Sequence, residues 1–189
     1  MTNQRALFWK NNMNFGAIAG LAIIIAYILL YFLNIDYENF LTLLISFTIL
    51  ISVIIIGTKH FKNNIQTGNI NYGRALGVGT TISFFASVFI AFYLFIFYKF
   101  IDTEALGKIY SMQEDILYEQ GLPNYKIEIS LDIFKKLNTP FIMSILKIFS
   151  YTFWGFIFSL ITSAFLKKKS NSYDAAMAEI EKENNEENK

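Results

Sequence analysis

Apolar residues in this chain are gathered into four long runs rather than spread at the spacing of an amphipathic helix. The runs cover about residues 15–33, 40–56, 76–98 and 141–166. The first run, at about 1.5 Å per residue, is roughly 28 Å long, close to the thickness of the hydrocarbon core of a bilayer. Such runs are typical of bilayer-spanning helices. We therefore predict an all-α, polytopic membrane protein with a four-helix transmembrane domain in residues 1–170.

Positive charges next to the runs predict how the spans are oriented. The flanking lysines and arginines are Arg5, Lys10, Lys59, Lys62, Arg74 and residues 167–169. These residues precede the first span, lie in the second connection or follow the fourth span. If the chain crosses the membrane four times, all three segments lie on the same side of the membrane. The first connection instead has Asp36 and Glu38 and no base. Because lysine and arginine are enriched in cytoplasmic loops, we expect both termini and the second connection to be cytoplasmic.

The connection between the third and fourth spans, residues 99–140, is long enough to contain helices of its own. Its first half has apolar residues at helical spacing, namely Ala105, Leu106, Ile109, Met112, Ile116 and Leu117. A second helix is predicted for residues 125–137, with an apolar face made of Ile127, Leu131, Phe134 and Leu137. The alternation in residues 126–131 also fits a strand. We expect this outer loop to cap the bundle or to lie on the outer leaflet.

Small residues in and next to the spans predict where helices approach one another, because packing replaces the hydrophobic effect as the source of helix association in lipid. The predicted packing positions are Gly16, Gly20, Gly73, Gly77, Gly79, Ser83, Ser87, Gly155, Ser159 and Ser163. Most recur four residues apart and therefore share a helix face. This spacing favours contacts within one bundle. It leaves open that one face joins copies of the chain or lines a water-filled path.

Composition excludes several classes of protein. The chain is 54% hydrophobic and 16% charged, has a formal net charge of +1 and contains no cysteine. These values exclude a disordered chain, a disulfide-stabilised domain, a thiolate metal site and a broad basic surface for nucleic acid. Residues 171–189 differ from the rest because they are acidic and rich in asparagine, and we predict a disordered cytoplasmic tail there.

Few residues have the chemistry of a catalytic or metal site. His60 is the one histidine in the sequence, so we expect neither a histidine metal cluster nor a catalytic triad. Lys147 is the one charge within the four runs. Long cationic side chains near helix ends reach the membrane interface, where this lysine would meet lipid phosphate; the alternative is a pairing with an acid of the outer loop. We predict no catalytic residue, no metal and no cofactor.

The most distinctive local motif is NYGRALGVGTTISFFAS, residues 71–87. Arg74 lies in the polar approach to the third span, where a guanidinium is placed to contact a lipid phosphate or a protein partner. Gly73 and Gly77 would allow another backbone to come close. The alternative is an arginine that only keeps its loop on the cytoplasmic side.

Several segments together resemble a known family. FWKNNMNFGAIAG opens the first span, YGRALGVGTTISFFAS opens the third, YKFID ends it, and EQG lies in the outer loop. Over about residues 5–170 the chain is similar to the domain-of-unknown-function 4199 family of small bacterial membrane proteins with four spans. This resemblance implies the four-span architecture and a bacterial inner membrane. It implies no activity and no catalytic residue.

These features favour a non-enzymatic integral membrane protein that acts as an accessory or structural interaction partner. The alternative is a small channel or transporter subunit, in which Ser83 and Ser87 line a path in a homo-oligomer. We expect the partners to be the lipid bilayer and either a second copy or another membrane protein, and we expect no nucleic acid.

Overall fold

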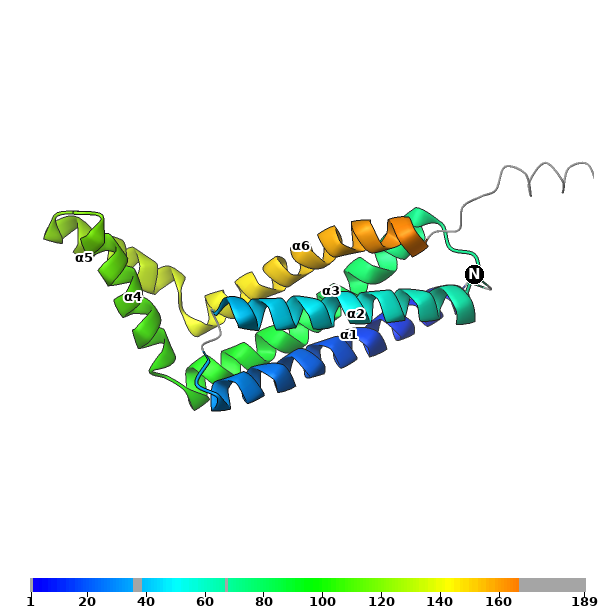
Figure 1. Cartoon of the computed structure of the whole chain (residues 1–189), viewed down its shortest axis with the longest axis horizontal. Helices are drawn as coiled ribbons and strands as arrows, with labels where there is room; N and C mark the ends of the chain where they lie inside the picture. The colour runs from blue at the N-terminus through cyan, green and yellow to red at the C-terminus, as the bar shows by residue number, and fades with distance from the viewer. Residues whose placement is uncertain (1, 36–38, 67, 167–189) are drawn as a thin grey trace, which may run out of the picture.

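The computed structural model describes residues 2–35, 39–66 and 68–166 (Figure 1). Within these ranges the secondary structure is entirely helical, which confirms the all-α prediction. The elements are α1 Thr2–Phe32, α2 Phe40–Asn64, α3 Tyr72–Ile96, the π-helical turn η1 Phe97–Ile101, α4 Ala105–Glu119, α5 Asn124–Leu137 and α6 Pro140–Leu166. Asp36, Glu38, the lysines at 167–169 and the predicted tail at 171–189 lie outside the described residues.

Four of the helices, α1, α2, α3 and α6, have the length and apolar composition of membrane spans. Two of them extend well past the apolar runs that predict them, since α1 already begins at Thr2 and α2 continues to Asn64. No proline interrupts these polar extensions, so the helical hydrogen bonds continue through them. Asn39 caps the start of α2, where its Oδ1 accepts a hydrogen bond from the Leu41 N–H at 2.9 Å. α6 begins at Pro140, as expected of proline in a first helical turn.

α3 is the central helix of the bundle. It packs against α1, α2 and α6, whereas α1 and α6 make few contacts with each other. Figure 1 shows the start of α1, the α2–α3 connection and the end of α6 at one end of the bundle, here called the terminal end. The α1–α2 connection and the α4–α5 pair lie at the opposite end, here called the hairpin end. Four crossings require the start of α1 and the end of α6 to lie at the same end of the bundle.

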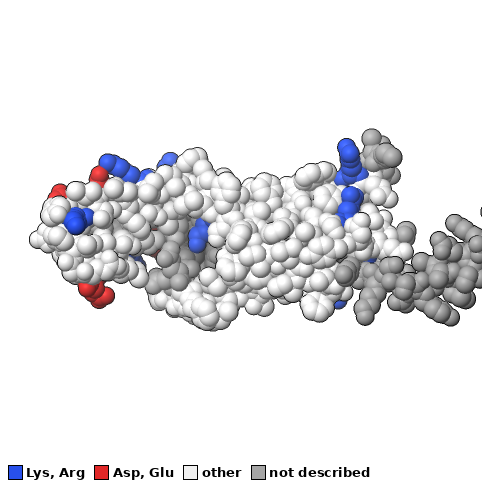
Figure 2. All heavy atoms as spheres, turned by 90° about the horizontal axis from the view of Figure 1, so that it is seen from above, with Lys and Arg blue, Asp and Glu red and all other residues white. Residues whose placement is uncertain are grey.

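The middle of the bundle has an uncharged surface. On the face shown in Figure 2, the charged side chains gather toward the two ends of the molecule and leave a long uncharged stretch between them. Large apolar side chains are exposed along the spans, including Ile25, Phe92 and Phe153, which are 58%, 67% and 61% exposed. Such a belt is unfavourable in water and favourable in lipid. The chain is therefore a multi-pass membrane protein.

α4 and α5 form a helical hairpin that extends beyond the hairpin end of the bundle (Figure 1). The base of this hairpin belongs to the bundle core, because Leu106 lies in the same buried cluster as Tyr98. Farther out the hairpin has a small core of its own, made by Leu117, Ile127 and Leu131. The loop therefore does not fold back over the bundle as a cap, which was one of its two predicted arrangements.

The second half of the outer loop is helical, and the strand interpretation of residues 126–131 is wrong. A strand would place Ile127, Ile129 and Leu131 on the same face. In α5 instead, Ile127 and Leu131 are buried in the hairpin core while Ile129 is 58% exposed. Ile127 and Leu131 are four residues apart, so in a helix they share one face, and this face packs against Leu117 of α4.

Candidate functional site

Glycines of α1 lie where this helix crosses α3. A Cβ atom at Gly20 would lie 2.7 Å from Phe89 Cβ and 3.1 Å from the Ala86 carbonyl oxygen. Gly16 is equally close to α3, since a Cβ there would lie 2.9 Å from the Ile82 carbonyl oxygen. Both glycines thus allow the two backbones to approach at a distance that larger residues would prevent.

The small residues of α3 and α6 face each other inside the same chain. Gly79 lies against Ser159, and Gly155 lies against Ser83. The Ser159 hydroxyl donates to the Leu76 carbonyl oxygen at 3.1 Å, which joins the two helices.

The remaining predicted serines belong to the same α3–α6 region. Ser83 and Ser87 are fully buried, and their hydroxyls donate to carbonyl oxygens of their own helix at 3.0 and 2.7 Å. Ser87 also lies 3.3 Å from the Thr152 hydroxyl of α6, and Ser163 is 1% exposed. Because these side chains lie inside a single bundle, the arrangement favours helix packing over the lining of a path between copies.

Gly73 and Gly77 do not pack closely against another helix within the described part of this chain. A Cβ atom at either position would meet nothing within 4 Å. Gly73 lies in the exposed first turn of α3, and Gly77 lies on the part of α3 that no other helix covers closely. The packed face of α3 therefore follows the stripe of Ala75, Gly79, Ser83 and Ser87, which are all buried, and Gly73 and Gly77 lie on another side of the helix.

A hydroxyl cluster inside the bundle has no counterpart among the predicted sites. The Tyr27 hydroxyl of α1 and the Tyr151 hydroxyl of α6 share a hydrogen bond, and both side chains are buried. Ser46 of α2 is a hydrogen-bond partner of both tyrosines and also donates to the Thr42 carbonyl oxygen at 2.7 Å. The available signal was a tyrosine in the interior of a span, away from the interfaces where tyrosine usually lies.

His60 lies beside asparagines at the start of α1. Its Nδ1–H donates to Asn11 Oδ1 at 2.9 Å, and Asn11 Nδ2 donates to Asn12 Oδ1 at 3.0 Å. The described residues contain no group of three or more His, Cys, Asp or Glu side chains arranged to hold a metal. The geometry gives this histidine a role in joining α2 to α1.

Two polar groups near His60 are buried without a hydrogen-bond partner among the described residues. They are Asn12 Nδ2 and Thr58 Oγ1, on side chains that are 0% and 1% exposed. An unpaired polar group in an apolar interior costs free energy. These two groups therefore mark a part of the bundle where packing is not optimised for stability.

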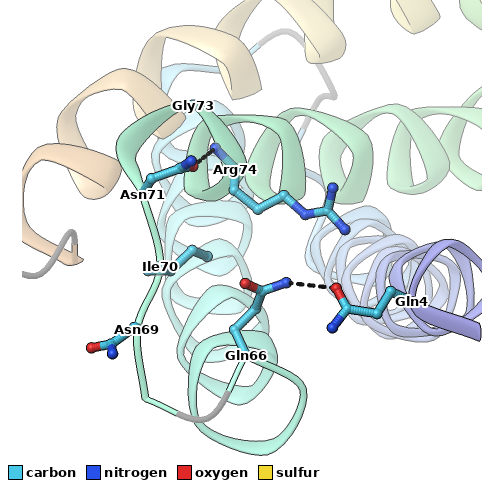
Figure 3. Close-up of a pocket in the computed structure, with 7 residues that line it drawn as sticks. All are labelled: Gln4, Gln66, Asn69, Ile70, Asn71, Gly73 and Arg74. Carbon is cyan, nitrogen blue, oxygen red and sulfur yellow. Dashed lines mark hydrogen bonds between the residues drawn. The ribbon is translucent and has the colours of Figure 1, made fainter. Parts of the chain in front are cut away.

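Arg74 borders a hollow at the terminal end, shown in Figure 3. The hollow has a volume of about 830 Å³ and is lined by Gln4, Gln66, Asn69, Ile70, Asn71, Gly73 and Arg74. Asn71 caps α3, since its Oδ1 accepts the Arg74 backbone N–H at 2.8 Å. Across the hollow, the Gln66 side chain from the end of α2 donates to the Gln4 side chain of α1 at 3.5 Å. The start of α3 and the start of α1 thus form two of its walls.

The Arg74 side chain rests on aromatic rings. Its guanidinium carbon lies 4.9 Å from the ring centroid of Phe8 and 5.6 Å from that of Phe61, which is within the range of cation–π attraction. The two rings also pack edge to face, with centroids 5.6 Å apart. The Nε atom is buried and has no hydrogen-bond partner among the described residues. The rings therefore fix this cation without neutralising its charge.

Lys147 lies partly buried on α6. The one ion pair among the described residues joins Lys136 to Asp132 on α5, at 2.7 Å. The alternative prediction, in which Lys147 pairs with an acid of the outer loop, is therefore not observed.

Comparison with protein families matches residues 14–168 to the family described as protein of unknown function (DUF4199). Comparison with curated proteins and with solved structures gives no match. The match covers α2, α3, α6 and the hairpin completely and α1 from residue 14 onward, including the segments around Gly16, Arg74 and Gly155. The chain therefore belongs to the DUF4199 family of membrane proteins of unknown function.

Proposed function

We propose that this protein is a non-enzymatic accessory or structural partner of the bacterial inner membrane, and that it binds another protein chain through the α4–α5 hairpin. The observation that carries this proposal is the exposed apolar surface of a hairpin whose outer part extends beyond the bundle (Figure 1). The bundle core supports a structural role, since the Tyr27, Ser83 and Ser159 hydroxyls bond within the protein.

Both hairpin helices expose large apolar side chains. On α4, Met112 and Ile116 lie four residues apart and are 62% and 46% exposed. On α5, Tyr125, Ile129 and Ile133 follow the same spacing and are 61%, 58% and 52% exposed. The exposed apolar side chains along the spans contact lipid, but the hairpin extends past the ends of the spans. Apolar stripes beyond the bilayer are stabilised by burial against another protein.

The charges of the chain support one orientation. Arg5, Lys10, Lys59 and Lys62 belong to the two helix ends that meet at the terminal end, where the described residues contain no acid, whereas at the hairpin end five lysines between Lys99 and Lys136 accompany seven acids between Asp102 and Asp132. The short connection between α1 and α2 has no lysine or arginine, so the positive-inside rule supports a terminal end in the cytoplasm and a hairpin outside it. A partner of the hairpin would accordingly be extracytoplasmic or have an extracytoplasmic part.

The test is the mass of the complex extracted from its native membrane in lipid nanodiscs. We expect the wild-type chain in a particle that holds more protein than one 21.8 kDa chain. The double variant Met112→Glu with Ile129→Glu should release a single chain, because two carboxylates would be buried in the contact. A multiple of the chain mass identifies a second copy, and any other mass identifies a different protein.

The matched control is Ser111→Glu with Asn124→Glu. It adds the same charge to the same two helices at exposed polar positions, and we expect it to keep the complex. Circular dichroism should show equal helix content in all three proteins. A wild-type particle with one chain, or identical masses for both double variants, would contradict the proposed role of the hairpin.

A further inference from the structure

We propose that the hollow beside Arg74 is a binding site for a phosphate group, contributed either by an anionic lipid headgroup or by a soluble phosphate compound. The site lies at the terminal end, where α1, the α2–α3 connection and the start of α3 meet (Figure 3). It is independent of the hairpin and of the function proposed for it.

The Arg74 guanidinium is held in place by aromatic rings. The ring centroids of Phe8 and Phe61 lie 4.9 and 5.6 Å from the guanidinium carbon, and these rings offer no acceptor oxygen. Within the described ranges it forms no ion pair, and its Nε has no hydrogen-bond partner. A fixed guanidinium with unused donors binds phosphate through two parallel hydrogen bonds at little cost in side-chain entropy.

The surroundings of the hollow are positively charged. Among the described residues, no acid lines the hollow. The charged side chains that the described structure has on the neighbouring helix ends are all basic, including Arg5 on α1 and Lys62 on α2. A carboxylate ligand would also be attracted by this field. Phosphate gains more here because it offers additional oxygen atoms to the side-chain amides in the lining.

The lining of the hollow is polar. The side chains of Gln4 and Gln66 bring amide groups to the rim, and Gly73 leaves the first turn of α3 uncovered because a Cβ there would meet open space (Figure 3). A volume of about 830 Å³ is larger than a phosphate ion needs and accommodates a headgroup or a phosphorylated small molecule. The exposed Trp9 and Leu7 nearby on α1 fit a position at headgroup depth.

The experiment uses the full-length protein, first freed of lipid in detergent and then examined by native mass spectrometry. One arm adds phosphatidylglycerol, with phosphatidylcholine as the zwitterionic comparison. The other arm adds inorganic phosphate or pyrophosphate. We expect one of these anionic probes to bind and Arg74→Gln to weaken its binding at least about tenfold, the effect of losing a charge-assisted pair of hydrogen bonds. Arg74→Lys should give an intermediate affinity, because it keeps the charge and loses the two-point contact.

The control is Lys59→Gln, which removes one positive charge from the same end of the bundle at an exposed side chain outside the lining. It should change the affinity less than about twofold, as expected for a screened surface charge. Thermal unfolding of Arg74→Gln and Arg74→Lys shows whether each is folded, and the lysine variant remains informative if the glutamine variant is not.

Each result separates the possible sources. Selective binding of phosphatidylglycerol that depends on Arg74 supports a lipid headgroup site, and binding of inorganic phosphate or pyrophosphate that depends on Arg74 supports a soluble ligand. Equal losses in Arg74→Gln and Lys59→Gln would show that only diffuse charge acts, and would overturn the proposal. Unchanged binding in Arg74→Gln, or no binding of any probe to the wild-type protein, would overturn it as well.

Discussion

The hydroxyl groups of Tyr27 and Tyr151 share a hydrogen bond inside the bundle, although these residues are 124 positions apart in the sequence. They belong to α1 and α6, which otherwise make few contacts because α3 lies between them. Ser46 of α2 bonds to both tyrosines. The cluster therefore joins three spans on the side of the bundle that α3 does not hold together.

We expect Tyr27→Phe and Tyr151→Phe each to lower the free energy of unfolding by about 0.5–1.5 kcal/mol, the range for side-chain hydrogen bonds between membrane helices. Because each change leaves the other hydroxyl short of a partner, the double variant should lose less than the sum of the single losses. Reversible unfolding in mixed detergent micelles measures all three values. Tyr125→Phe on the exposed face of α5 is the control, and strictly additive losses would contradict the bond.

The contact of α3 with α6 depends on two glycines. We expect Gly79→Ala and Gly155→Ala each to lower the unfolding free energy by about 1–3 kcal/mol, because the new methyl group would overlap Ser159 or Ser83. The matched control is Gly77→Ala, where a Cβ meets nothing within 4 Å. That change should be neutral or stabilise the helix by about 0.5–1 kcal/mol. Thermal unfolding in detergent separates the two groups of variants, and equal effects at Gly77 and Gly79 would argue against the packing described.

The sequence predicts the spans well because lipid requires one feature, a long apolar helix, that is visible in a single run of residues. It also identifies small residues that share a face, such as Gly79 and Ser83. Spacing alone cannot specify what a face meets. Gly73 and Gly77 have the same four-residue spacing as Gly79 and Ser83, but they lie next to open space.

The contacts that join distant parts of the chain are the least predictable from sequence. Tyr27, Ser46 and Tyr151 each look like an isolated polar residue until the three helices are assembled. The Arg74 site is partly visible in the sequence as an arginine before a span. Its aromatic support is not, because Phe8 and Phe61 come from two other helices.

Thr58 is a position where a buried polar atom reduces stability. Its Oγ1 has no hydrogen-bond partner in the described part of the chain, and its side chain is 1% exposed. Valine has nearly the same shape, so Thr58→Val should keep the packing and remove the unpaired hydroxyl, raising the unfolding free energy by about 1 kcal/mol. The control is Thr81→Val, since the Thr81 hydroxyl donates to the Gly77 carbonyl oxygen at 2.7 Å. A loss of stability in Thr58→Val as large as that in the control would show that Thr58 is bonded in the membrane.

Tyr110 gives the hairpin a dependence on alkaline pH. Its hydroxyl donates to the Asn138 carbonyl oxygen at 3.0 Å, which ties α4 to the end of α5. Burial raises the pKa of this phenol above its ordinary value of about 10, because the phenolate is disfavoured there. A group whose pKa is higher in the folded state contributes its full stabilisation below the unfolded pKa. This stabilisation is then lost as the pH rises through the pKa that the group has in the folded state.

We therefore expect the hairpin to be closed up to a pH of about 10 and to loosen above it. Spin labels at the exposed positions Met112 and Ile129 report the separation of α4 and α5 as the pH rises. The ultraviolet difference between wild-type protein and Tyr110→Phe isolates the titration of this one phenol. In Tyr110→Phe the separation should already be broader at neutral pH and lack the alkaline step, because the phenol that bonds Asn138 and titrates is gone. An identical alkaline step in both proteins would assign it to another group.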